Sequence, residues 1–152
     1  MISHIFFILL IVGAALLGGA ISATDFRRRI IPDAYLFPLM LIGLILTTFY
    51  RFPTTPTDSV IGASFGYILA VCIGVIFDYV SRIRGRHIDT PIGMGDIKLI
   101  GVGGLWLGTN GLAMALIVSC ILGMIWGRMH KQRYIPFAPF FITGAIISIL
   151  LM

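Results

Sequence analysis

Long apolar runs separated by short polar clusters are the dominant pattern along this chain. Runs of membrane-spanning length occur at about 4–24, 33–50, 60–80, 91–109, 110–127 and 135–152. Because a backbone surrounded by lipid must satisfy its own hydrogen bonds, each run is predicted to be a helix. The pattern therefore predicts an all-α, polytopic membrane protein: residues 1–152 form a single membrane-embedded domain, a compact bundle of six transmembrane helices.

The fourth run is the least regular of the six. It is cleanly apolar only from Ile97 to Leu107, which is roughly 16 Å of helix at 1.5 Å per residue, about half of a hydrocarbon core. To cross the membrane, this helix must begin before Asp96 or be shorter than its neighbours. In either case Asp96 is expected close to the membrane boundary.

The basic residues predict an orientation. Nine of the eleven Lys and Arg residues lie in three alternate connections, three in each: Arg27, Arg28 and Arg29; Arg82, Arg84 and Arg86; Arg128, Lys131 and Arg133. Cytoplasmic loops carry an excess of such residues, so these connections are predicted to be cytoplasmic and both termini to lie outside. The first run has no positive charge before it, which indicates a retained span rather than a secretory signal.

Composition excludes several other classes of protein. The chain is 59% hydrophobic and 11% charged, with a mean hydropathy of +1.05, too little polar surface for a soluble domain of this size. Its net charge of +5 is grouped between apolar runs, so the expected surroundings are a lipid bilayer and not nucleic acid. Cys72 and Cys120 lie inside apolar runs, and the three histidines are dispersed, so no disulfide, metal site or cofactor is expected.

Glycines four residues apart occur inside several of the apolar runs, as at Gly62 and Gly66 or Gly104 and Gly108. Small residues at this spacing let helices approach closely. They favour a compact bundle, and a homo-oligomer is a second interpretation of the same pairs.

The chain has six aspartates and no glutamate, and four of the six have structural interpretations. Asp33 follows a proline at the start of a run, as expected of a helix N-terminus. Asp58 lies in an outer loop and is predicted to be a solvated turn residue. Asp78 is four residues before Arg82, the spacing of a helical ion pair. Asp89 lies in a basic connection and is predicted to be solvated.

Asp25 and Asp96 differ from the other four because they lie at the same predicted membrane boundary. Asp25 ends the first run and Asp96 opens the fourth, so two helices lying side by side would bring the carboxylates together. Paired carboxylates activate water without a metal: the ionised one acts as general base and the protonated one donates to the scissile carbonyl. Asp25 and Asp96 are therefore the candidate catalytic residues.

The residues around Asp96 are candidates for shaping the site. The segment reads Gly93-Met94-Gly95-Asp96-Ile97-Lys98. Without side chains, Gly93 and Gly95 allow a substrate backbone to approach the carboxylate. Lys98 is interpreted either as a contact to lipid headgroups or cytoplasm, or as a group that tunes the site.

Three segments resemble the type IV prepilin peptidases, the bacterial branch of the G-x-G-D membrane aspartic proteases. The first is Ala23-Thr24-Asp25 followed by Pro32-Asp33; the second is Gly93-Met94-Gly95-Asp96-Ile97-Lys98 with the glycine-rich stretch after it; the third is Ile135-Pro136-Phe137-Ala138-Pro139-Phe140. The resemblance implies a multi-pass protein of the bacterial inner membrane that removes the basic leader of prepilin or pseudopilin precursors. It assigns catalysis to Asp25 and Asp96.

Two further expectations follow from the resemblance. Larger members carry an additional N-terminal region that methylates the new pilin N-terminus, and this sequence opens directly on the first peptidase-like run, so peptidase activity alone is expected. The alternatives are an intramembrane protease of the presenilin type and a non-catalytic assembly or transport subunit that uses its aspartates for proton or ion passage.

Overall fold

The computed structural model describes residues 2–83, 93–130 and 135–152, and every regular element in this part of the chain is helical. The elements are α1 (Ile2–Arg28), α2 (Asp33–Ile45), its π-helical continuation η1 (Leu46–Tyr50), α3 (Pro56–Ile83), α4 (Met94–His130) and α5 (Phe137–Leu151). Within these described ranges, four stretches are long and apolar enough to cross a membrane, and α5 is a shorter apolar helix. The all-α prediction is confirmed for the described residues.

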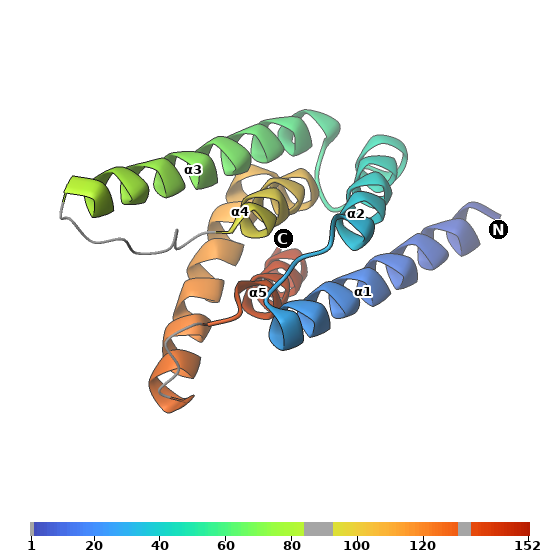
Figure 1. The fold of residues 1–152 in the computed structure, drawn as a ribbon. Helices are drawn as coiled ribbons and strands as arrows, with labels where there is room; N and C mark the ends of the chain where they lie inside the picture. Colours follow the sequence, from blue (N-terminus) through green and yellow to red (C-terminus); the bar gives the residue numbers. More distant parts are fainter. Residues whose placement is uncertain (1, 84–92, 131–134) are drawn as a thin grey trace.

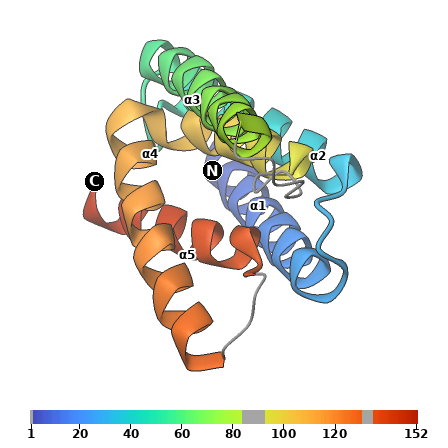
Figure 2. The same ribbon diagram turned by 60° about the vertical axis from the view of Figure 1, so that its left-hand side comes forward.

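The fourth and fifth predicted runs together form α4. This helix is interrupted at Gly108, whose φ of 67° and ψ of −172° are not helical, and it changes direction there (Figure 2). The break falls within one residue of the predicted division between the runs. Residues 91 and 92 of the predicted 91–109 run lie outside the described residues. Gly93 is described, and α4 begins at the next residue.

Helix α4 forms the centre of the core, and α3 and α5 pack along it (Figure 1). The crossing of α3 and α4 depends on glycine: a Cβ on Gly62 would lie 2.5 Å from the carbonyl oxygen of Gly104, and a Cβ on Gly104 would run into the Gly62 backbone. Beside it, the Ser59 hydroxyl donates to the Leu105 carbonyl oxygen. The close helix approach predicted from these glycines is confirmed.

The prediction that Asp58 is a solvated turn residue is wrong. Its carboxylate is half-buried and accepts hydrogen bonds from the hydroxyls of Thr109 (2.7 Å) and Thr54 (3.1 Å). Gly108 lies directly against this carboxylate. Asp58 therefore ties the start of α3 to the break in α4, a contact between residues 51 positions apart that no local pattern signals.

Helix α1 lies at the edge of the bundle. It packs on α2 and α5, whereas α4 packs on α3, α5 and α2. The expectation that the helices of Asp25 and Asp96 lie side by side is wrong for the helix bodies. Helices α2 and α5 link them, and an apolar cavity of about 440 Å³ is lined by residues of α1, α4 and α5.

Candidate active site

Asp25 lies in the last turn of α1 and is 5% exposed. Its carboxylate accepts a hydrogen bond of 2.8 Å from the backbone N–H of Ala138, in the first turn of α5. Helix α1 ends just beyond it, where Arg29 adopts a left-handed conformation (φ 55°) and donates its backbone N–H to the Asp25 carbonyl oxygen. The Asp25 side chain is thus held between the end of one helix and the start of another.

The start of α5 is built to receive this carboxylate. Its N-cap residue is Pro136, which makes no side-chain capping bond, and Pro139 has no N–H. The free donors of the first turn are therefore those of Phe137 and Ala138, and a helix N-terminus attracts negative charge. Asp25 caps α5 from a different helix. A role for Ala138 was not predicted from the sequence, although two prolines three residues apart at a helix start are a usable signal.

Asp96 lies in the first turn of α4 and is half-buried. Its carboxylate accepts the backbone N–H of Gly93 at 3.2 Å, the arrangement in which an acid at the third helical position caps its own helix. The Ile97 N–H donates to the Gly93 carbonyl oxygen, which starts the helical ladder. Asp96 therefore has a fixed position at the point where α4 begins.

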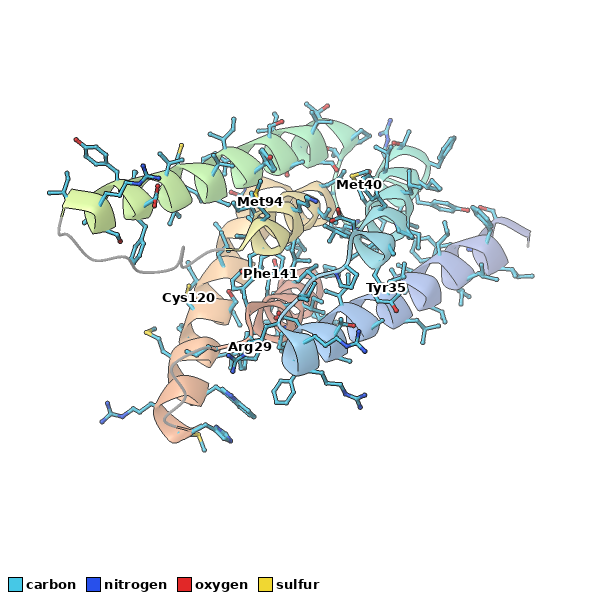
Figure 3. All side chains as sticks on the ribbon, in the orientation of Figure 1. Arg29, Tyr35, Met40, Met94, Cys120 and Phe141 are labelled. Atoms are coloured by element: carbon cyan, nitrogen blue, oxygen red, sulfur yellow. The ribbon has the colours of Figure 1, made fainter. Side chains whose placement is uncertain are left out.

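Asp25 lies near enough to Asp96 for its charge to act on the Asp96 carboxyl group. The positive charge of Arg29 also interacts with Asp25. Figure 3 marks the three surrounding elements by its labels Met94 at the start of α4, Arg29 just past α1, and Phe141 in α5. Two carboxylates placed this way can divide the roles of general base and general acid toward one water molecule.

The two glycines before Asp96 have different surroundings. A Cβ on Gly95 would lie 2.9 Å from the Cβ of Ile31, so the segment after α1 packs directly onto the first turn of α4 there. Gly93 is exposed, and a Cβ on it would lie 3.5 Å from the Asp96 carboxylate. In this structure Gly95 allows the Ile31 side chain to come close, whereas Gly93 leaves the carboxylate approachable from outside.

Lys98 forms an ion pair with Asp33: its Nζ lies 2.9 and 2.7 Å from the two carboxylate oxygens. The pair joins the first turn of α2 to α4 two residues after Asp96. Asp33 therefore both starts α2 and pairs with Lys98. The sequence did not predict this pairing, because the two residues are 65 positions apart. Asp78 and Arg82 form the predicted ion pair at 3.0 Å, and Asp89 lies outside the described residues.

If the Asp33–Lys98 pair holds the start of α4 in place, reversing one charge should impair the site and reversing both should restore it. We expect Asp33→Lys to lower the rate of leader removal, the activity that the sequence resemblance implies, roughly two- to fivefold. This is the effect of losing a partly exposed ion pair. The Asp33→Lys/Lys98→Asp double variant should recover most of the loss. The matched control reverses the exposed Asp78–Arg82 pair on α3. Equal losses in both single and double variants would show that the pair has no positioning role.

Among the described residues, four helical stretches are long enough to span a membrane, which indicates the class: a multi-pass membrane protein, here with Asp25 and Asp96 as a candidate carboxylate pair. The sequence model of the type IV leader peptidase family matches residues 8–128, which include both aspartates. The chain belongs to this family.

The curated relatives are consistent with the family match. A protein from Burkholderia pseudomallei (strain K96243), named prepilin leader peptidase/N-methyltransferase, is 33% identical over 143 residues, which are 90% of this chain and 43% of the relative. Proteins of the same name from Pseudomonas aeruginosa and Stutzerimonas stutzeri are 30% and 29% identical over 138 residues, 86% of this chain and 45% of each relative. The chain spans less than half the length of these relatives. No solved structure matches it.

Proposed function

We propose that this chain is a membrane aspartic endopeptidase that removes the basic leader of type IV prepilin or pseudopilin precursors. The observation that carries the proposal is the electrostatic interaction between Asp25 and Asp96 in a chain of the type IV leader peptidase family. The relatives' names supply the substrate class. Peptidase activity without methylation, expected from the sequence, stays a prediction.

In the proposed mechanism the two aspartates act on one water molecule. The ionised carboxylate removes a proton from the water, and the protonated carboxyl donates to the oxygen of the scissile carbonyl. The N–H groups of Ala138 and Gly93 hold the two side chains in fixed orientations before substrate arrives, which lowers the cost of reaching the reactive geometry. In this mechanism the two carboxyl groups titrate as a unit, so the base and the acid are roles of the pair rather than of one named residue.

The substrate is proposed to meet the pair at the cytoplasmic face, where the predicted positive loops lie. Arg84, Arg86, Lys131 and Arg133 of these loops lie outside the described residues. Three contacts support a common side for the described helix ends that flank the loops. The ring of Phe26, next to Arg27, lies 6.1 Å from the ring of Trp126, near the end of α4. The start of α4 lies near the end of α1, since Asp96 interacts with Asp25. Helix α3 runs antiparallel to the first half of α4, because Gly62 contacts Gly104 and Gly66 contacts Ile100.

The opposite side of the bundle carries the two termini and the break in α4. The hydroxyl of Tyr50 donates to the Ser3 carbonyl oxygen (3.0 Å), which joins the start of α1 to the end of η1. A Cβ on Gly111, three residues after the break, would lie 3.0 Å from the sulfur of Met152. These contacts support the proposed topology: six membrane crossings in the bacterial inner membrane, α4 counted as two about Gly108, and both termini outside.

The proposal is tested by co-expressing the chain with candidate pilin-type precursors from the same cell. Leader removal is read as a gel shift and by mass of the new N-terminus. A purified sample should retain cleavage after treatment with a chelator, since the chemistry assigned here needs only the two carboxylates. Intact precursors in every combination would refute the proposal, and loss of cleavage on chelation with recovery on adding zinc would refute the two-aspartate mechanism.

A further inference from the structure

The apolar cavity between α1, α4 and α5 begins one helical turn from the candidate active site on all three helices. Ser22 precedes Asp25 by three residues, Leu99 follows Asp96 by three, and Phe141 follows Ala138 by three. All three residues line the cavity. Since residues three apart share a helix face, the cavity extends from the same side of each helix that presents the site.

Its walls are almost entirely apolar, and α1 contributes mainly small residues. The α1 wall consists of Ile11, Ala14, Ala15, Gly18, Gly19 and Ser22. From Ile11 to Ser22 this wall is about 16 Å long at 1.5 Å per residue, the length of about five residues of extended chain. The volume is about 440 Å³. The cavity thus has the chemistry and the length to receive a short apolar peptide segment that leads away from the carboxylate pair.

We propose that this cavity binds the first apolar residues that follow the scissile bond of the precursor. The assignment rests on the proposed function: the resemblance to the type IV prepilin peptidases implies a cut just after the basic leader and just before a hydrophobic segment. The scissile bond then lies at the carboxylate pair, the basic leader stays on the cytoplasmic side, and the apolar segment enters between α1 and α5. Chain direction and hydrophobicity would together select the bond that is cut.

A second groove, of about 540 Å³ between α2, α3 and α4, is a weaker candidate for the same segment. The ion-paired Asp33 and Lys98 line it, and α1, which carries Asp25, contributes no residue to it. An apolar segment placed there would face a charged pair and would be separated from Asp25 by α4. The cavity beside α1 has neither disadvantage.

Gly19 provides a direct test, because it lines the cavity and a Cβ built on it meets no atom within 4 Å. Because a Cβ here meets open space, we expect a leucine side chain to extend into the cavity, and leucine is a better helix former than glycine. We expect Gly19→Leu to raise the KM for the precursor at least about tenfold, with kcat changed much less, because ground-state binding is lost. Gly19→Ala should have an intermediate effect.

Gly74→Leu on α3 is the matched control, since a Cβ on Gly74 also meets nothing within 4 Å and the residue lies outside both cavities. It should cleave like the wild type. If Gly19→Leu accumulates in the membrane and keeps the wild-type KM, this assignment is wrong while the proposed function stands. A wild-type chain that leaves the precursor uncut refutes the proposed function and the assignment together.

Photocrosslinking identifies the occupant independently of turnover. Benzoylphenylalanine placed at Gly19 in an Asp96→Asn background should crosslink to the precursor, at residues just after the cleavage site. Crosslinks to lipid alone, unchanged when precursor is added, would overturn the proposal, as would crosslinks only within the leader.

Discussion

Replacing either Asp25 or Asp96 by asparagine is expected to lower leader removal by at least about 100-fold, the lower range of what a positioned acid or base contributes. Asparagine keeps the size of the side chain and can still accept the N–H of Ala138 or Gly93, so the fold should persist. It cannot lose or hold the proton that the reaction transfers. The measurement is the initial rate of precursor processing, normalised to the amount of protein in the membrane.

The control for this experiment is Asp78→Asn. Asp78 also lies near the end of a helix of spanning length, but its partner is the exposed Arg82 one turn away on α3. Removing the Asp78 charge should therefore leave processing nearly unchanged. Asp58→Asn is unsuitable as a silent control, because Asp58 holds the break in α4 through Thr109 and Thr54. Wild-type processing by either the Asp25 or the Asp96 variant would exclude the two-aspartate mechanism.

The sequence was sufficient to predict the helices, because their signal is local. Apolar runs of spanning length mark α1, α2 with η1, and α3, and the helix-breaking Gly108 lies at the predicted division between the fourth and fifth runs. The candidate aspartates were also identifiable, since a charged group at the end of an apolar run is costly without a function. Each of these inferences uses only neighbouring residues.

The partners of the site residues could not be predicted, because they depend on which helix ends meet in space. The pairing of Asp33 with Lys98 spans 65 positions, and that of Asp25 with Ala138 spans 113. The same limit explains why the prediction that α1 and α4 lie side by side was wrong for the helix bodies. Equal membrane depth places the two carboxylates at one level, but it does not say whether the helices carrying them touch or are joined through α2 and α5.

Gly104 can be expected to show the largest stability effect in the bundle. Replacing it by valine should destabilise the folded protein by at least about 3 kcal/mol, the upper part of the usual range for overpacking. The destabilisation is large because the atoms that the added side chain meets belong to the backbone of α3. A Cβ at this position meets the Gly62 carbonyl group and the backbone nitrogen of Ala63 (2.9 Å). A flexible side chain could rotate away, whereas helix backbone can yield only if α3 moves as a whole.

A movement of α3 would also disturb the active site indirectly, because α3 holds the break in α4 through Asp58. We therefore expect Gly104→Val to lower the thermal unfolding midpoint of the detergent-purified protein and the amount recovered from membranes, with processing falling in proportion to folded protein. Gly74→Val is the matched control: it makes the same substitution where a Cβ meets nothing within 4 Å. If both variants unfold at the wild-type midpoint, α3 and α4 do not cross at Gly62 and Gly104.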